Sequence, residues 1–290
     1  GYYVAQDKDF YAEEGLNVII KPGGPDIAPA QVLAGGGADV MVDWMPSALA
    51  AREKGLPLVN IAQPFKSSGM MLTCRKDMGV NTTADLKGKT LGVWFYGNEY
   101  PFLSWMSRLG YKTDGSADGV TVLKQGWGVE PLTEGQAACV STMSYNEYWV
   151  VRDAGYSPEE LTVFKYQAEG AATLEDGLYV HEKNMSDPVF KDKMVRFVRA
   201  SMKGWKYAEE NPKEAAMIIL DNDDAGVQTE KHQVRMMGEI AKLTAGSNGS
   251  LDPADYERTV EVLMSGASDP VITKKPSGAW THEITNAALK

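Results

Sequence analysis

The sequence predicts an α/β fold in which short buried strands alternate with helices. The first observation is a series of short apolar or β-branched runs that recurs through the first 180 residues. The second is the helical spacing of most segments between these runs, a pattern typical of a parallel sheet with helices on both faces. The third is the length of 290 residues, which we interpret as two lobes of ordinary domain size.

Each apolar run is expected to form one strand. The expected strands are at residues 17–20, 38–42, 58–62, 70–74, 90–95, 120–123, 137–140, 161–166 and 177–180. The last hundred residues change to helical spacing, with an apolar stripe that begins after Ser186 and ends near Asn211. The C-terminal third is therefore expected to be mostly helical, with further helices at 214–220, at 229–243, from Pro253 onward and up to Lys290.

The segment from Trp94 to Phe102 is the richest in candidate ligand contacts. It combines several aromatic rings with an amide and a carboxylate, and it joins a predicted strand to a predicted helix. Gly97 is expected to form the turn, Asn98 to cap the helix and Pro101 to lie in its first turn. Junctions of this kind are where open α/β sheets bind ligands, so we expect the segment to line a binding site.

Candidate ligand-binding residues are the polar and aromatic side chains at strand ends and in the turns that follow. Trp44 could instead pack a helix start, Trp94 could face the core, and Glu147 could be a solvated glutamate in a first helical turn. Trp105 and Trp205 lie on helical stripes and are expected in the core. The full set of candidates is Asp43, Trp44, Gln63, Ser67, Ser68, Trp94, Tyr96, Asn98, Glu99, Tyr100, Tyr145, Asn146 and Glu147.

The charges in these segments indicate the kind of ligand. No Arg or Lys lies within residues 92–105 or 136–151, and Glu99 stands near the expected helix start. A buried anion must be paired, so sulfonate, nitrate and phosphate are disfavoured. A carboxylate beside aromatic faces suits an amino-substituted heteroaromatic ring, whose amine and protonated ring nitrogen can both donate to it.

The net charge of −10 and the isoelectric point near 4.9 argue against nucleic acid or an anionic membrane surface as a partner. No run approaches the roughly 18 apolar residues that span a bilayer. The chain begins at Gly1 without a signal peptide, so we expect a processed or truncated chain. We also expect a monomer.

The two cysteines, Cys74 and Cys139, lie in separate apolar runs that we assign to different lobes. They are expected to be free and buried, because unpaired cysteines usually behave as small hydrophobic residues.

No motif for catalysis is found. His181, His232 and His282 are far apart in the sequence, and none has a nearby cysteine or histidine at metal-ligand spacing. The sequence also lacks a P-loop, a nucleophile elbow and a dinucleotide-binding glycine motif. We therefore expect neither a metal nor a cofactor, and a protein that is not an enzyme.

Four segments, at residues 1–18, 34–43, 56–62 and 82–93, together resemble periplasmic solute-binding proteins of the NMT1/THI5-like group. The resemblance implies a two-lobed periplasmic binding protein fold of type II. The ligand would lie between the lobes, and the protein would deliver it to the membrane permease of an ABC importer. Its place would be the periplasm, or a lipid anchor outside the cytoplasmic membrane.

The resemblance also implies domain boundaries. Residues 1–89 and 181–290 would form lobe 1, and residues 90–180 would form lobe 2. The family's first strand precedes the segment that begins at Gly1, so that strand is expected to be missing from this chain. Asp9 stands where the family usually has glycine, and it is expected to keep the left-handed turn there.

Within this family, the branch that binds thiamine-precursor pyrimidines fits the candidate residues best. A flavin-binding importer component is an alternative, because a wider aromatic slot would also stack an isoalloxazine ring. An alternative of another class is the THI5-like enzyme that synthesises the thiamine pyrimidine. That branch uses a cysteine-rich, iron-dependent motif, which this sequence lacks.

Overall fold

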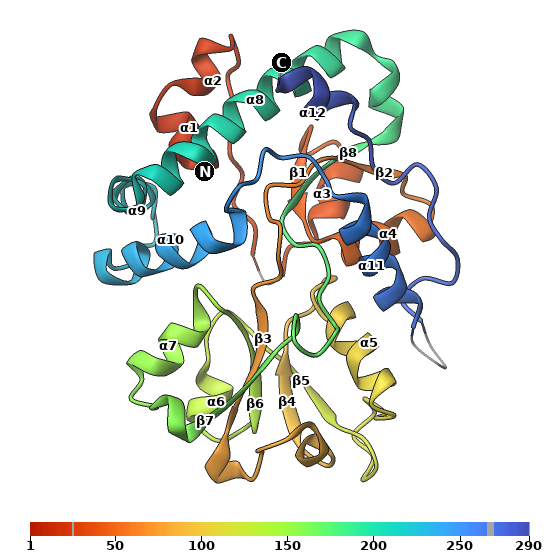
Figure 1. Ribbon diagram of the computed structural model, residues 1–290, viewed down its shortest axis with the longest axis vertical. Coiled ribbons are helices and arrows are strands. Elements are labelled where there is room, and N and C mark those ends of the chain that lie inside the picture. Colours follow the sequence, from red (N-terminus) through yellow and green to blue (C-terminus); the bar gives the residue numbers. More distant parts are fainter. Residues whose placement is uncertain (25, 266–269, 290) are drawn as a thin grey trace.

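The computed structural model describes residues 1–24, 26–265 and 270–289. It shows two α/β halves, one above the other along the long axis of the molecule (Figure 1), each built around its own sheet. We call the half with the three-stranded sheet lobe 1 and the half with the five-stranded sheet lobe 2. The α/β class expected from the sequence is confirmed.

Lobe 1 contains a sheet of strand order β1-β8-β2, in which β8 pairs antiparallel with both neighbours. The strands are β1 (Met41–Asp43), β2 (Leu58–Ala62) and β8 (Gly177–His181). Four helices from the first part of the chain belong to this lobe: α1 (Tyr2–Asp7), α2 (Phe10–Glu13), α3 (Pro29–Ala34) and α4 (Met45–Glu53). The later helices are α8 (Pro188–Glu210), α9 (Pro212–Asp221), α10 (Glu230–Thr244), α11 (Pro253–Met264) and α12 (Glu283–Ala288).

Lobe 2 contains a mixed sheet of strand order β5-β4-β6-β3-β7. β4 is parallel to β5 and β6, whereas β3 runs antiparallel to β6 and β7. The strands are β3 (Met70–Arg75), β4 (Thr90–Val93), β5 (Thr121–Lys124), β6 (Cys139–Met143) and β7 (Leu161–Lys165). The helices are α5 (Tyr100–Arg108), α6 (Glu130–Thr133) and α7 (Glu147–Asp153). Short 3₁₀ turns lie at η1 (Lys76–Met78), η2 (Thr83–Leu86), η3 (Pro158–Glu160) and, in lobe 1, η4 (Glu182–Ser186).

Eight of the nine expected strands are present, but residues 17–20 do not form one. A strand needs a neighbour to satisfy its backbone polar groups. In the described part of the chain this segment pairs with no strand, and its carbonyl at Val18 accepts only a 3.4 Å hydrogen bond from the Gln6 side chain. Val18 packs against the lobe 1 core while Ile19 is 75% exposed, so the alternation of burial is present without the pairing.

Two strands, β3 and β8, lie in the opposite lobe to the one that the expected boundaries imply. β3 belongs to the five-stranded sheet and not with residues 1–89, and β8 belongs to the three-stranded sheet and not with residues 90–180. The placement of these two strands was wrong because their partners are distant in sequence. The chain therefore crosses between the lobes through residues 63–69 and 166–176.

The expectation for the cysteines was also wrong. Cys74 and Cys139 form a disulfide, and they are directly opposite each other in the antiparallel pairing of β3 with β6. Two separate apolar runs became neighbours through strand register, which the spacing in the sequence does not reveal.

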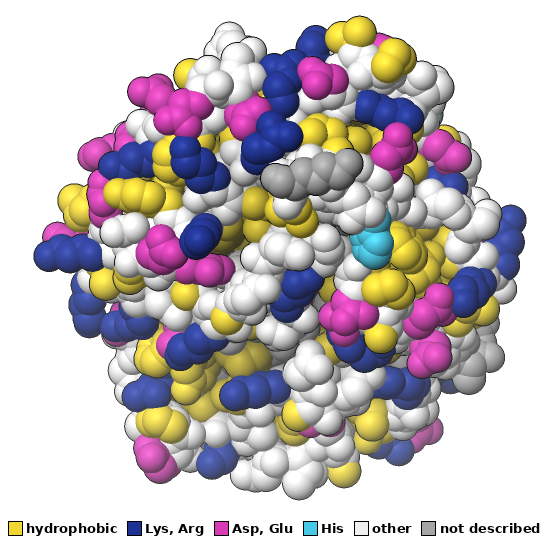
Figure 2. Space-filling model, turned by 45° about the horizontal axis from the view of Figure 1, so that its top comes forward, with side chains coloured by type: hydrophobic (Ala, Val, Ile, Leu, Met, Phe, Trp, Pro, Cys, Tyr) yellow, Lys and Arg dark blue, Asp and Glu magenta, His cyan; other side chains and the backbone are white. Residues whose placement is uncertain are grey.

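The two tryptophans on helical stripes and the backbone at Asp9 are as expected, whereas the sheets are antiparallel or mixed and not parallel. Trp105 is buried in the lobe 2 core and Trp205 in the lobe 1 core, while Asp9 has a φ of 59° between α1 and α2. Figure 2 shows acidic and basic side chains interspersed over the visible face. Among the described residues, no helix combines the length and apolar character needed to cross a membrane.

Candidate functional site

A cavity of about 280 Å³ lies between the two lobes. Six of the candidates from the sequence line it, and they come from both sides of the gap: Asp43, Trp44, Trp94, Tyr96, Asn98 and Glu147. The other lining residues are Gly24, Ile27, Pro29, Val42, Phe95, Gly126, Trp127, Met143 and Asp176.

On the lobe 1 side, Asp43 ends β1 and Trp44 precedes α4. The Asp43 carboxylate accepts hydrogen bonds from the Trp44 backbone N–H and from the Ser47 hydroxyl, each at 2.8 Å. Both oxygens are thereby used to hold the start of α4. Burial raises the pKa of Asp43 to about 7, although these hydrogen bonds oppose the shift.

On the lobe 2 side, the turn after β4 brings aromatic rings to the cavity. The Trp94 indole N–H donates to the Gly126 carbonyl at 3.0 Å, which fixes that ring. Tyr96 has a φ of 62° and remains 43% exposed. Gly97 lies against α4, where a Cβ would come within 2.3 Å of Ser47 Cβ, so a side chain at this position would separate the two lobes.

Glu147 is the first residue of α7, and its side chain is buried. One oxygen accepts from the Met143 backbone N–H at 2.9 Å and the other from the Asn146 side-chain amide at 2.7 Å. Burial raises the pKa of this carboxyl to about 7. Glu147 is therefore not a solvated first-turn glutamate: it lines the cavity with both oxygens already hydrogen-bonded.

Asp176 is the main lining carboxylate that sequence reasoning missed. It lies in the second crossing segment, immediately before β8, with a φ of 50°. Burial raises its pKa to about 6, although a hydrogen bond from the Trp44 side chain opposes the shift. Ligand contacts are expected at residues that follow strands, whereas Asp176 precedes β8. The sequence feature that could have identified Asp176 is the pair of adjacent acidic residues, Glu175 and Asp176, directly before a predicted strand.

The neighbouring Glu175 has a different task. Its carboxylate accepts from the Ser68 hydroxyl, from Gly69 N at 2.8 Å and from Met70 N at 3.3 Å. Burial, reinforced by the charge of Asp176, raises its pKa to about 8. Glu175 thus joins the two crossing segments and does not line the cavity.

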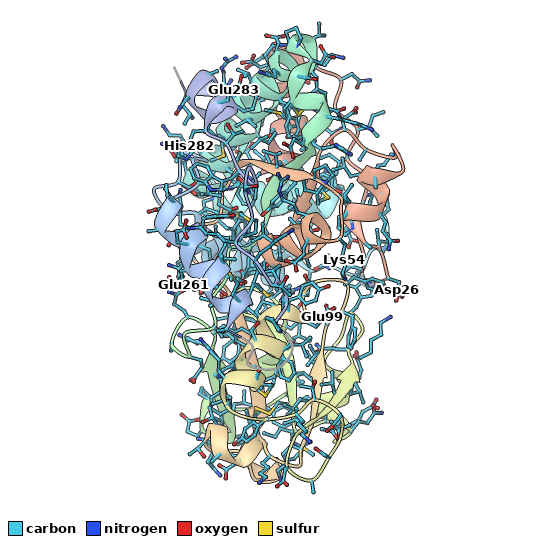
Figure 3. All side chains as sticks on the ribbon, turned by 90° about the vertical axis from the view of Figure 1, so that its right-hand side faces the viewer. Asp26, Lys54, Glu99, Glu261, His282 and Glu283 are labelled. Atoms are coloured by element: carbon cyan, nitrogen blue, oxygen red, sulfur yellow. A yellow bond between two sulfur atoms is a disulfide. The ribbon has the colours of Figure 1, made fainter. Side chains whose placement is uncertain are left out.

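Contacts between the lobes also close part of the cavity mouth. Lys124, at the end of β5, forms a 2.9 Å ion pair with Asp26 of lobe 1 and lies 4.9 Å from the centre of the Tyr96 ring. Trp127 is 73% exposed, and a Cβ at Gly24 would lie 3.6 Å from its ring. Figure 3 shows Asp26 and Glu99 near the level where the two halves meet.

Seven candidates do not line the cavity: Gln63, Ser67, Ser68, Glu99, Tyr100, Tyr145 and Asn146. Gln63 is fully buried and donates to the carbonyls of Phe65 and Glu175. Ser68 is the partner of Glu175. The hydrogen bonds of both side chains hold the crossing segments together.

The other candidates that do not line the cavity also have local partners. Glu99 replaces Asn98 as the N-cap position of α5, and its carboxylate accepts from Gly97 N at 2.7 Å. Tyr100 packs against a lobe 1 core cluster, and Tyr145 lies 6.5 Å from Phe65, ring centre to ring centre. The Asn146 side chain lies between Glu147 and His232, at 2.8 Å from the His232 ring nitrogen.

The cavity offers aromatic faces and hydrogen-bond acceptors. Three carboxylates line it, whereas its described lining contains no Lys, Arg or His. Within the described ranges, no group of three or more His, Cys, Asp or Glu side chains could hold a metal ion. The arrangement is suited to a small planar ligand that donates hydrogen bonds.

A family model described as NMT1/THI5-like matches residues 1–215. Over 274 residues, the chain is 26% identical to a formylaminopyrimidine-binding protein of Halalkalibacterium halodurans, covering 90% of this chain and 79% of that protein. A shorter match, 30% identical over 91 residues, is to a 4-amino-5-hydroxymethyl-2-methylpyrimidine phosphate synthase of Schizosaccharomyces pombe, covering 31% of this chain and 26% of that protein.

The fold is similar to that of the periplasmic aliphatic sulphonate binding protein SsuA from Escherichia coli. The TM-score is 0.65 at 13% identity, with 91% of this chain and 81% of that chain covered. The similarity confirms the expected periplasmic binding protein fold. At this identity it carries no information about the ligand.

Proposed function

Because the chain belongs to the NMT1/THI5-like family, we propose that it is the solute-binding component of an ABC importer and that its ligand is a thiamine-precursor aminopyrimidine. One observation carries the choice of ligand: an inter-lobe cavity lined by aromatic rings and three carboxylates, with no cationic side chain in its described lining. The similarity to a formylaminopyrimidine-binding protein supports the same class of ligand.

The size of the cavity favours a single ring. Pockets for drug-sized ligands usually enclose about 300–1,000 Å³, and this cavity encloses about 280 Å³. A flavin, with three fused rings and a polyhydroxyl chain, fits less well than a pyrimidine. A sulfonate would meet Asp43, Glu147 and Asp176 without a counter-charge, which disfavours it despite the similarity of fold.

The enzyme alternative has less support. Cys74 and Cys139 are joined in a disulfide, so they are not free to ligate iron. The similarity to a pyrimidine phosphate synthase covers about a third of the chain, whereas that to a binding protein covers nine tenths of it. We infer a binding protein without catalytic activity, for which incubation with vitamin B6, histidine and iron should yield no pyrimidine.

The disulfide also supports a location outside the cytoplasmic membrane. Disulfides form and persist in oxidising compartments such as the bacterial periplasm. Cys74 and Cys139 are both fully buried, consistent with a structural bond. A periplasmic or lipid-anchored protein of this fold would pass its ligand to a membrane permease, which we propose as its protein partner.

Native mass spectrometry of the gently purified protein tests the ligand class. A bound mass equal to an aminopyrimidine would support the proposal, and a flavin mass would support the alternative. Calorimetric titration with 4-amino-5-hydroxymethyl-2-methylpyrimidine, riboflavin and an alkanesulfonate should show saturable binding of the pyrimidine. Binding of the sulfonate in preference to the pyrimidine would contradict the proposed ligand.

A further inference from the structure

Asp176 differs from the two other carboxylates that line the cavity. Asp43 and Glu147 each have both oxygens hydrogen-bonded to donors of their own lobe. The Asp176 carboxylate has a hydrogen bond from the Trp44 side chain and, among the described residues, no other. It therefore retains the greatest capacity to accept a hydrogen bond from a ligand.

The backbone on both sides of Asp176 helps to hold it in place. Its φ of 50° is uncommon for a residue other than glycine and is often found where function constrains the chain. The preceding residue, Glu175, is anchored to the first crossing segment through Ser68 and Gly69. The following residue, Gly177, is packed so tightly that a Cβ would lie 2.5 Å from the Asn60 side-chain nitrogen. Asp176 thus lies between two neighbours that make close contacts with other segments.

Among the described residues, no Lys, Arg or His lines the cavity beside Asp176. The titratable groups that interact with it come from several elements: Asp43 at the end of β1, Glu175 in the crossing segment, Tyr145 before α7, Tyr179 on β8 and Tyr2 on α1. Glu147 faces the same cavity from α7. Lys124, which lies 4.9 Å from the ring centre of the lining residue Tyr96, is paired with Asp26 instead. A carboxylate that is half-buried and lacks a counter-charge is unfavourable, so the cavity favours a ligand that carries a positive charge.

We propose that the cavity binds its pyrimidine as the ring-protonated cation and that Asp176 is the specificity-determining carboxylate, accepting a hydrogen bond from the protonated ring nitrogen. This inference rests on the proposed function and specifies the charge of the ligand. The complex holds one proton between ligand and Asp176. The faces of Trp44, Trp94 and Tyr96, which line the same cavity, would further stabilise a cation.

The proton balance gives binding a distinctive pH dependence. At high pH both the free pyrimidine and Asp176 are deprotonated, so binding takes up a proton from solvent. At low pH both are protonated, so the Asp176 proton is released when the cation binds. Burial raises the pKa of Asp176 to about 6, which places this release at mildly acidic pH. Affinity should therefore pass through a maximum between the pKa of the free ligand ring and that of Asp176.

Titration calorimetry with 4-amino-5-hydroxymethyl-2-methylpyrimidine, in buffers that differ in ionisation enthalpy, measures this exchange. We expect uptake that approaches one proton above the maximum and net release below it. Asp176→Asn should lower the affinity for this ligand by about tenfold to a hundredfold, because a charge-assisted hydrogen bond is replaced by a neutral one. Asparagine also adopts a positive φ readily, so the variant should fold.

Two controls test whether the effect of Asp176→Asn comes from the charge–charge contact between ligand and carboxylate. The desamino analogue 5-hydroxymethyl-2-methylpyrimidine is a weaker base whose unprotonated ring nitrogen cannot donate to Asp176, so Asp176→Asn should not lower its affinity. Glu99→Gln alters a carboxylate that bonds to Gly97 outside the cavity, and it should leave the affinity for the aminopyrimidine unchanged. Thermal melting of each variant establishes that it is folded.

The outcomes separate this inference from the proposed function. If the protein binds the aminopyrimidine without proton exchange, or if Asp176→Asn binds as tightly as the wild type, the inference is overturned and the proposed function stands. If the wild type binds no pyrimidine between pH 5 and pH 8, both are overturned.

Discussion

Lys124 of lobe 2 and Asp26 of lobe 1 form a 2.9 Å ion pair across the mouth of the cavity, with the Lys124 ammonium 4.9 Å from the centre of the Tyr96 ring. One cation therefore contacts both a residue of the opposite lobe and an aromatic side chain that lines the cavity. Residues 26 and 124 are held together only when the lobes are close.

Loss of this pair should speed ligand release. Both side chains are largely exposed, so the pair is weak, and Lys124→Ala should raise the dissociation rate only about two- to fivefold. Stopped-flow fluorescence with the aminopyrimidine at low and high salt measures the effect. Lys87→Ala is the matched control, since Lys87 forms a similarly exposed pair with Asp118 within lobe 2. Equal rates for the two variants would show that the Lys124 pair does not affect release.

Ligand binding should change tryptophan fluorescence through Trp127. This ring is 73% exposed at the cavity mouth, and closure of the lobes around a ligand would reduce its contact with water. We expect Trp127→Phe to lose the part of the emission change that comes from closure of the mouth, while Trp44 and Trp94, which line the cavity, still respond to the ligand. Trp149→Phe is the control, since Trp149 does not line the cavity. Small-angle scattering should show a smaller radius of gyration with ligand, and no change in either measurement would contradict closure.

The ligand-free protein should lose stability as the pH rises from about 4 to about 8. Burial raises the pKa values of Asp43 and Glu147 to about 7 and that of Glu175 to about 8. Over this range these carboxyls bind fewer protons in the unfolded state than in the folded state, so they make the free energy of unfolding fall with increasing pH. The Gly1 amino group, whose pKa burial lowers to about 5, opposes this effect without cancelling it. Urea unfolding at pH 5 and pH 8 should differ by on the order of 1–4 kcal/mol.

Glu175→Gln should reduce this pH dependence. The amide cannot ionise, and its oxygen can still accept a hydrogen bond from Gly69. Glu99→Gln is the control, because Glu99 is outside the buried cluster. An unchanged difference between pH 5 and pH 8 in Glu175→Gln would exclude Glu175 as a source of the effect.

Removal of the disulfide should cost stability but not affinity. Cys74 and Cys139 are 65 residues apart, and closing such a loop stabilises a protein by about 4 kcal/mol in the chain-entropy model. Cys139 begins β6 and Met143, which lines the cavity, ends it, so the two residues are separated by roughly 13 Å along the strand. We expect the Cys74→Ala/Cys139→Ala variant to melt at lower temperature and to bind the aminopyrimidine with unchanged affinity. A tenfold loss of affinity would show that the disulfide also shapes the cavity.

The local parts of the structure could be predicted from the sequence. Apolar runs located eight strands, because burial periodicity is a local property. The rule that ligands lie at strand ends located Asp43, Trp94 and Glu147 at the cavity.

Long-range features could not be predicted in this way. The partners of β3 and the pairing of Cys74 with Cys139 depend on strand register between distant segments. Asp176 was missed because its position depends on a left-handed backbone in a crossing segment, which no periodicity signals. The strand-end rule also predicts Gln63 as a ligand contact, but its amide donates to the Phe65 and Glu175 carbonyls within the crossing segments.

The hydrogen bonds of Glu175 have a mechanical consequence. The carboxylate binds Ser68, Gly69 and Met70, and its carbonyl accepts from Gln63, so the segment before β8 is attached to the segment before β3 at several points. If the two crossing segments were not attached to each other, the halves could twist and slide as well as open. Because the two crossing segments are hydrogen-bonded to each other, they act as one hinge. We expect the halves to rotate about a single axis through Ser68 and Glu175. Asp176 lies next to that axis, where a small rotation moves a side chain least, so its distance to a bound ligand would stay nearly constant as the halves open and close.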